Sequence, residues 1–298
     1  MDAVIPWRAP LAIAALAAAC GGAPPPPPHH TATASDDSTE LFGDRAYKPR
    51  SFAVRVHGHG RPVIFIPGLG CPGEMWDDTV ARLGDDVEAH VLTLAGFAGR
   101  KPVKPPLAAT VRRELVRYIR SHKLDHPIIV GHSMGGFIAY WLAETAPTLV
   151  GGVVVVDAGP ALADNDLETA RSLRNMWAQA GDDELPQQVR DAYTGMVGDP
   201  KRIEPYLDAI AKSDRQTMGD AIYELVTTDV RPHVADIRAP LLLVLSDGYY
   251  QQMYRQQADP VPDHEVVVLH THHFVMLDDP DGFTKTLAKF LADHAPNS

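Results

Sequence analysis

Six short apolar runs set the strongest limit on how this chain folds. Each run is rich in Val, Ile and Leu and lacks the polar alternation of a strand that has one face in water. Helical segments separate the runs, as expected where helices cover both faces of a parallel sheet. The runs are 63–66, 91–94, 128–130, 153–156, 241–245 and 266–269. The sequence therefore predicts an α/β protein with a mostly parallel, doubly wound sheet.

Three further segments complete the predicted architecture. Residues 51–57 alternate apolar and polar side chains, which predicts an antiparallel edge strand, and the Gly-His-Gly turn at 58–60 predicts a hairpin to the next strand. From about 159 to 238 the pattern is helical, with no convincing strand. We expect this interval to form a helical cap over the carboxyl ends of the strands, where ligands bind in such sheets.

The N-terminal residues differ in composition from the rest of the chain. An apolar stretch at 11–19 follows Arg8 and is too short to span a bilayer, but it matches the hydrophobic part of a secretion signal. Residues 16–21 (LAAACG) resemble a bacterial lipoprotein processing box, in which Cys20 is lipidated after cleavage. The alternative is an ordinary cleaved signal peptide with an incidental cysteine. Residues 1–20 are thus predicted to direct export to the bacterial cell envelope or periplasm, with a lipid anchor on Cys20.

Residues 21–41 have the composition of a linker. Pro24–Pro28 are five consecutive prolines, which favour an extended polyproline II spacer, and the following Ser, Thr and Asp residues predict a disordered continuation. The folded domain is predicted to span 42–298. Contact with a membrane is expected only through the anchor.

The charge of the chain excludes one class of partner. The formal net charge is -11, which repels the phosphate backbone of nucleic acids and anionic lipid headgroups, so no nucleic-acid partner is predicted. His270, His272 and His273 lie close together, but no acidic or cysteine spacing completes a metal site. We therefore predict neither a metal nor an organic cofactor.

The most specific local motif is GHSMGG at residues 131–136, which follows the run 128–130 and begins a helical segment. In this strand-turn-helix context, G-x-S-x-G is typical of a nucleophile elbow. The turn is so tight that Gly131 and Gly135 must lack side chains, and it presents Ser133 above the sheet. Ser133 is therefore the predicted nucleophile.

With this motif in this context, the chain resembles the α/β-hydrolase superfamily of serine esterases and lipases over about residues 50–295. The resemblance implies an α/β-hydrolase fold with a helical cap inserted after the sixth strand, the run 153–156. Members bind the oxyanion with two backbone N–H groups, which correspond here to Leu69 and Met134. Pro67 stands where members usually have a histidine, but neither N–H comes from that position.

The family resemblance extends to a base near the C-terminus. Residues 272–280 (HHFVMLDDP) resemble the loop in which a histidine precedes an aromatic residue, an apolar residue, an acid and a proline. This alignment selects His273 over its neighbours His270 and His272. A neutral imidazole there can take the proton of Ser133 during attack and return it to the leaving group.

Members also carry an acidic residue that orients the histidine, and here this sequence departs from the common family pattern. Counted beyond the seventh strand, 241–245, the usual position falls on Tyr249, which cannot serve as the acid. Two residues remain as candidates: Asp157, directly after the run 153–156, where some members place the acid, and Asp247. We favour Asp157 and keep Asp247 as the alternative. Either carboxylate could instead only brace its own turn.

Together these features predict an exported carboxylesterase or lipase-like enzyme. It would cleave a small-molecule acyl ester through an acyl-Ser133 intermediate, with His273 as general base. The alternative is a non-catalytic binding or receptor protein on the same fold, which the missing acid beyond the seventh strand favours.

Overall fold

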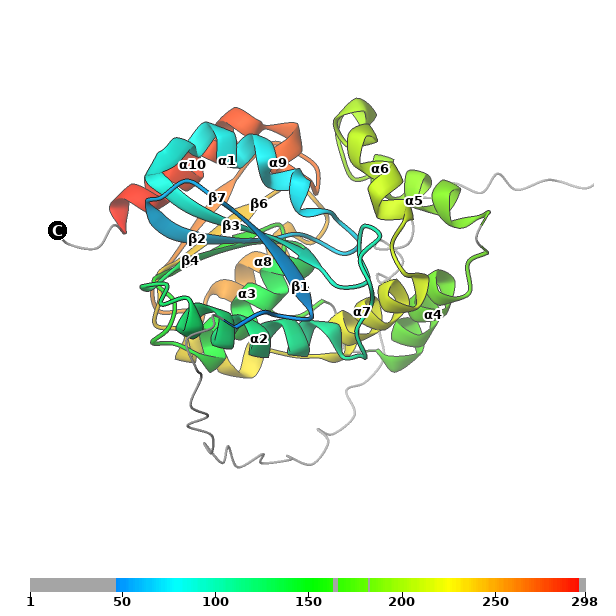
Figure 1. Cartoon of the computed structure of the whole chain (residues 1–298), viewed down its shortest axis with the longest axis horizontal. Coiled ribbons are helices and arrows are strands. Elements are labelled where there is room, and N and C mark those ends of the chain that lie inside the picture. The colour runs from blue at the N-terminus through cyan, green and yellow to red at the C-terminus, as the bar shows by residue number, and fades with distance from the viewer. Residues whose placement is uncertain (1–46, 163–165, 182, 295–298) are drawn as a thin grey trace, which may run out of the picture.

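The computed structural model describes residues 47–162, 166–181 and 183–294. The predicted signal segment at 1–20 with Cys20, and the predicted linker at 21–41, lie outside the described residues. Within them, a seven-stranded sheet lies between layers of helices (Figure 1). The predicted α/β class is confirmed.

The strands follow the predicted apolar runs closely. They are β1 (Phe52–His57), β2 (Arg61–Ile66), β3 (Val87–Leu94), β4 (Ile128–His132), β5 (Gly152–Val156), β6 (Leu241–Leu245) and β7 (His264–Val268). The order across the sheet is β1-β3-β2-β4-β5-β6-β7, and every neighbouring pair is parallel except β1 with β3. All residues of β4, β5 and β6 are buried, which explains why these runs carry no polar alternation.

The edge strand corrects one prediction. β1 is antiparallel and at the edge, as expected, but it pairs with β3 and not with the next strand along the chain, so the predicted hairpin is wrong. The register places Phe52 opposite Leu94 and His57 opposite Ala89. Burial explains the order, because β2 is mostly covered and suits the interior of the sheet, whereas β1 is largely half-buried or exposed and suits an edge.

Helices cover both faces of the sheet (Figure 1). One layer contains α1 (Asp77–Leu83) and α10 (Pro280–Asp293), with the short α9 (Val275–Asp278) beside them. The other contains α2 (Leu107–Ser121), α3 (Met134–Thr145) and α8 (Gln251–Ala258). α3 packs against β4 and β5 and buries most of its surface, so the strand-turn-helix unit around residue 133 lies in the centre of the domain.

The interval 159–238 forms the cap predicted from its helical pattern. It contains α4 (Leu167–Ala178), α5 (Leu185–Thr194), α6 (Glu204–Ala211) and α7 (Arg215–Thr227). It follows β5, the run 153–156 after which the cap was predicted, and this run is the fifth strand of the described residues. None of the helices in the described ranges is both long enough and apolar enough to cross a membrane.

Candidate active site

Ser133 lies at a strained turn between β4 and α3. Its φ of 53° and ψ of -118° belong to a region that side chains rarely adopt. Two hydrogen bonds hold it there: its N–H donates to the carbonyl of Val156 at 3.0 Å, and its carbonyl accepts from the N–H of Phe137 at 3.0 Å. Neighbouring strand and following helix thus hold the serine in place from both sides.

The two glycines of the turn allow a close approach of backbone to backbone. A Cβ on Gly131 would lie 2.1 Å from the carbonyl oxygen of Gly135, and one on Gly135 would lie 2.2 Å from the carbonyl oxygen of Ile66. No side chain fits at either position. The first turn of α3 therefore lies directly against the end of β2.

The loop after β2, residues 67–70, reaches the same turn. A Cβ on Gly68 would lie 3.3 Å from Cβ of Ser133, so the loop passes close to the serine. Met134 is the first residue of α3, and an N–H at this position has no partner within its helix. Leu69 and Met134 thus stand near Ser133, on the two backbone segments from which the sequence predicts the oxyanion hole.

His273 contacts one of the two candidate acids. It lies between β7 and α9, and its Nδ1–H donates to Oδ2 of Asp157 at 2.7 Å. The other carboxylate oxygen of Asp157 accepts from the N–H of Ser246 at 3.0 Å and from its hydroxyl at 2.9 Å. Asp157 is only 7% exposed. This carboxylate is therefore buried, fully hydrogen-bonded and directed at the imidazole.

The surroundings of Asp157 favour its ionised form. Burial raises the pKa of the carboxyl group, but the hydrogen bonds from His273 and Ser246 outweigh it, so the pKa lies below its usual value. The residue has a φ of 48°, and its N–H donates to the carbonyl of Val244 at 2.8 Å. The acid is thus fixed to the sheet by its own backbone.

The other predicted acid has a different partner. Oδ2 of Asp247 accepts from Nδ1 of His270 at 2.7 Å, and the side chain of His270 is 92% exposed. His272 pairs with Asp278, whose Oδ2 accepts from its backbone N–H at 2.9 Å. Each of the three neighbouring histidines therefore has a carboxylate of its own, and that of His273 is Asp157, at the carboxyl end of β5.

His132 is a part of the site that the sequence analysis missed. Its Nε2–H donates to the carbonyl of His273 at 3.0 Å, and its ring lies 4.7 Å from the rings of both His273 and Phe274. Burial, and then the proximity of His273, lowers the pKa of His132 to about 3, so this ring is neutral. A neutral His132 joins the serine turn to the histidine loop. In the sequence it occupied only a variable position of the motif.

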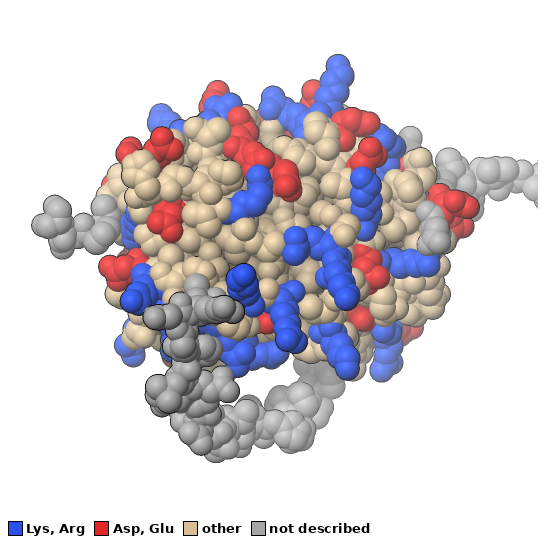
Figure 2. Space-filling model, in the orientation of Figure 1, with Lys and Arg blue, Asp and Glu red and all other residues tan. Residues whose placement is uncertain are grey.

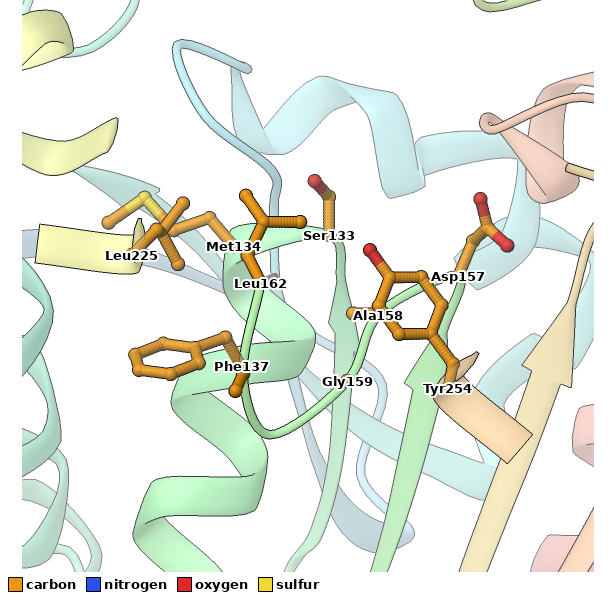
Figure 3. Close-up of a pocket in the computed structure, with 10 residues that line it drawn as sticks. Ser133, Met134, Phe137, Asp157, Ala158, Gly159, Leu162, Leu225 and Tyr254 are labelled. Atoms are coloured by element: carbon orange, nitrogen blue, oxygen red, sulfur yellow. The ribbon is translucent and has the colours of Figure 1, made fainter. Parts of the chain in front are cut away.

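A small cavity of about 40 Å³ opens beside Ser133. Figure 3 shows Ser133 and Asp157 at its rim, with the hydroxyl of Tyr254 directed toward the space between them. The remaining lining is apolar and comes from Met134, Phe137, Ala158, Gly159, Ala161, Leu162 and the cap residue Leu225. The site thus combines the hydroxyl groups of Ser133 and Tyr254 and the carboxylate of Asp157 with an otherwise apolar wall.

The thiol of Cys71 takes no part in these contacts, and no cluster of metal ligands lies in the described residues. Cys71 is buried, and burial raises the pKa of its thiol, which keeps it protonated. Across the described part of the chain, no three His, Cys, Asp or Glu residues lie together as metal ligands.

A family model for the "Alpha/beta hydrolase family" matches residues 63–286. Among curated proteins, the chain is 24% identical over 244 residues to "Putative carbamate hydrolase RutD" of Serratia proteamaculans (strain 568), covering 77% of this chain and 90% of that protein. It is also 24% identical over 246 residues to a pimeloyl-[acyl-carrier protein] methyl ester esterase of Sodalis glossinidius (strain morsitans), covering 77% and 93%.

Solved structures show the same fold at low identity. An esterase of Thermogutta terrifontis superposes with a TM-score of 0.73 at 18% identity, covering 82% of this chain and 94% of that one. The enol-lactonase of Burkholderia xenovorans LB400 superposes with a TM-score of 0.71 at 18% identity, covering 81% and 96%.

Proposed function

The chain belongs to the alpha/beta hydrolase family, and on this premise we propose that it is a serine hydrolase that cleaves a carboxylic ester through an acyl-Ser133 intermediate. The observation that carries the proposal is the 2.7 Å hydrogen bond from His273 to the buried carboxylate of Asp157. That bond fixes the tautomer of the imidazole, leaving Nε2 free to accept a proton.

The reaction would proceed in two halves. Nε2 of His273 takes the hydroxyl proton of Ser133 while Oγ attacks the ester carbonyl, and the N–H groups of Leu69 and Met134 stabilise the oxyanion. When the intermediate collapses, the alcohol leaves with the proton from His273. Water then attacks the acyl-serine by the same route and releases the acid. Asp157 stays ionised throughout and stabilises the imidazolium.

The cavity indicates the size of the acyl group. A space of about 40 Å³ with apolar walls accepts only a few non-hydrogen atoms, so we propose a short acyl chain as the preferred group. The names of the similar proteins support acyl transfer to water as the reaction class, since they include a methyl ester esterase and an enol-lactonase. An ester is therefore the first substrate class to test, before thioesters and amides.

The contact between Asp157 and His273 also weighs against the non-catalytic alternative. That alternative depended on the missing acid beyond the strand 241–245. With a carboxylate already at the imidazole, an acid in the loop after β6 is not required.

We propose further that the enzyme is exported to the bacterial cell envelope and anchored by a lipid on Cys20. The support is the sequence pattern of residues 1–20 and the linker-like composition of 21–41. Intact mass of the protein from the membrane fraction tests this, because lipidation adds acyl mass that Cys20→Ala must lack.

A fluorophosphonate probe tests the proposed reaction. We expect rapid labelling of the wild type and none of Ser133→Ala, and we expect the unlabelled wild type, but not Ser133→Ala, to hydrolyse short-chain nitrophenyl esters. Well-folded wild type that neither reacts with the probe nor hydrolyses the esters would refute the proposal. A series of acyl lengths should show turnover falling as the chain outgrows the cavity.

A further inference from the structure

A concentrated basic surface lies on α2 and the loop before it. Residues 99–124 contain eight Lys and Arg residues and a single acidic residue, Glu114, in a chain whose net charge is -11. Figure 2 shows Lys and Arg gathered over the part of this face where Figure 1 places α2. The local charge is therefore opposite to that of the whole molecule.

The helical spacing aligns the central charges. Arg113, Arg117 and Arg120 are exposed and follow one another at four and three residues, so they lie on one face of α2. Leu115 and Ile119, on the opposite face, are fully buried in the core. The burial of one face fixes the direction of the other, and the three guanidinium groups point to the same side of the molecule.

The one acidic residue of 99–124 does not neutralise this surface. The carboxylate of Glu114 is directed inward, where it accepts from the N–H and hydroxyl of Ser51 at 2.7 Å each and from the hydroxyl of Tyr47 at 2.9 Å. In the described ranges, none of Arg113, Arg117 and Arg120 forms an ion pair with a carboxylate. The positive charge is therefore available to a partner.

The described chain begins at this surface. The N–H of Tyr47 donates to the hydroxyl of Ser121, at the end of α2, at 3.2 Å, and the N–H of Arg50 donates to Glu114 at 2.8 Å. Lys48 is exposed beside them. Residues 1–46 therefore join the domain next to the basic face, which is where a membrane tether through Cys20 would be attached.

We propose that this basic face, defined by Lys48, Arg113, Arg117, Arg120 and Lys123, docks the domain on an anionic membrane surface. Each Lys or Arg near such a surface contributes about 1 kcal/mol, and a polybasic patch is one of the second signals that can strengthen membrane attachment through a lipid. The tether would keep the patch at a high effective concentration near the lipid, so a modest affinity suffices. This proposal is independent of the reaction at Ser133.

Vesicle binding of the full chain carrying Cys20→Ser tests the proposal without an acyl chain. The vesicles are phosphatidylcholine alone or phosphatidylcholine with about 30% phosphatidylglycerol. The readout is the partition coefficient on the anionic vesicles divided by that on the neutral vesicles. This ratio cancels any contribution of the apolar segment 11–19, which both kinds of vesicle share. The test variant is Arg113→Gln/Arg117→Gln/Arg120→Gln. The matched control, Arg171→Gln/Lys201→Gln/Lys285→Gln, removes three exposed charges from other elements. Circular dichroism verifies the fold of both.

We expect the ratio to fall about 100-fold in the test variant and to change little in the control. Conversion of the same three arginines to lysine should retain binding, and raising NaCl to about 0.5 M should abolish it. Equal ratios in the test and control variants would overturn the proposal. So would a wild type that ignores anionic vesicles but binds a DNA duplex through the same three residues.

Discussion

The sheet and the cap share one apolar core but differ in their polar contacts. Strands β4, β5 and β6 are buried along their whole length among apolar side chains. The cap also reaches the sheet domain through single polar contacts. The buried carboxylate of Glu224 accepts from the N–H groups of Ala108 and Ala109 at 2.8 Å each, and the N–H of Asp214 donates to the carbonyl of Gly96 at 2.7 Å.

Two further cap contacts end on the proposed oxyanion loop. The hydroxyl of Tyr193 donates to the carbonyl of Leu69 at 2.6 Å, and that of Ser213 donates to the carbonyl of Gly70 at 3.2 Å. Ser133, Asp157 and His273 follow the carboxyl ends of strands, whereas the cap contacts the backbone of the loop at 67–70. Changes at the sheet edge should therefore affect chemistry, and changes in the cap should affect geometry and stability.

The largest expected effect is on kcat, from a change at Asp157 after the end of β5. Asp157→Asn should lower kcat about 10⁴-fold, because the amide cannot hold the imidazole in the required tautomer. Asp247→Asn is the matched control and should stay close to wild type, since Asp247 pairs with the exposed His270. The measurement is kcat on a short-chain nitrophenyl ester, with circular dichroism to verify folding. Full activity of Asp157→Asn would disprove the assignment of the acid.

In the cap, the largest effect should be on stability. α2 begins after Pro106 with no side-chain cap of its own, so Glu224 satisfies its first N–H groups from α7. Glu224→Ala should lower the free energy of unfolding by about 2–3 kcal/mol in urea titrations, because two buried N–H groups lose their acceptor.

The control for this change is Glu168→Ala, an exposed carboxylate on α4, which should cost less than about 0.5 kcal/mol. Equal losses in the two variants would mean that Glu224 acts only through the general charge of the cap.

A smaller effect should separate positioning from binding. Tyr193→Phe removes the hydrogen bond to Leu69 and should lower kcat up to about tenfold with little change in KM, because the oxyanion forms only as the reaction proceeds. Tyr223→Phe, the same change on α7, controls for the loss of a cap hydroxyl. A rise in KM at constant kcat would instead assign Tyr193 to substrate binding.

The smallest effects concern pH, and they should differ in sign between the two regions. The pKa of Asp157 is lowered, so its contribution to stability is present above the unfolded value of about 3.9 and is lost as the pH falls further. Burial raises the pKa of Glu224, even though backbone N–H groups oppose the shift. Its contribution should therefore decrease as the pH rises above about 4.3.

Unfolding of the wild type, Asp157→Asn and Glu224→Ala across pH 3 to 7 measures both trends. The stability difference from Asp157→Asn should shrink toward acid pH, and that from Glu224→Ala should shrink toward neutral pH. Parallel trends would contradict the contrast between the two sites.

Local patterns were sufficient to predict the strands, though not their order. The six apolar runs became strands because full burial on both faces leaves a signal in adjacent residues. The preference for Asp157 over Asp247 rested on the family resemblance and not on such patterns. The contact itself depends on β5, β6 and β7 lying side by side, which brings Asp157 to His273 across 116 positions of sequence.

The order of strands and the polar contacts of the cap lay beyond local patterns for the same reason. The edge position of β1 was visible in its alternation, but its neighbour was not, because β2 enters the sheet between β3 and β4. In the sequence, nothing distinguishes Glu224 from other helical glutamates. Its carboxylate nevertheless accepts from the N–H of Ala108 at the start of α2, more than a hundred residues earlier. His132 likewise gains its role only when β4 meets the loop after β7.

Anchoring of the acid on β5 has a consequence for how this enzyme could diversify. The backbone of Asp157 is bonded into the sheet, and after β6 only Ser246 donates to its carboxylate among the contacts described above, so the imidazole needs no carboxylate from the turn at residues 247–250. That turn carries Tyr249, whose side chain is 74% exposed. Insertions or exchanges at residues 247–250 should therefore be tolerated, which makes this turn a natural place to graft new selectivity while the chemistry beneath stays intact.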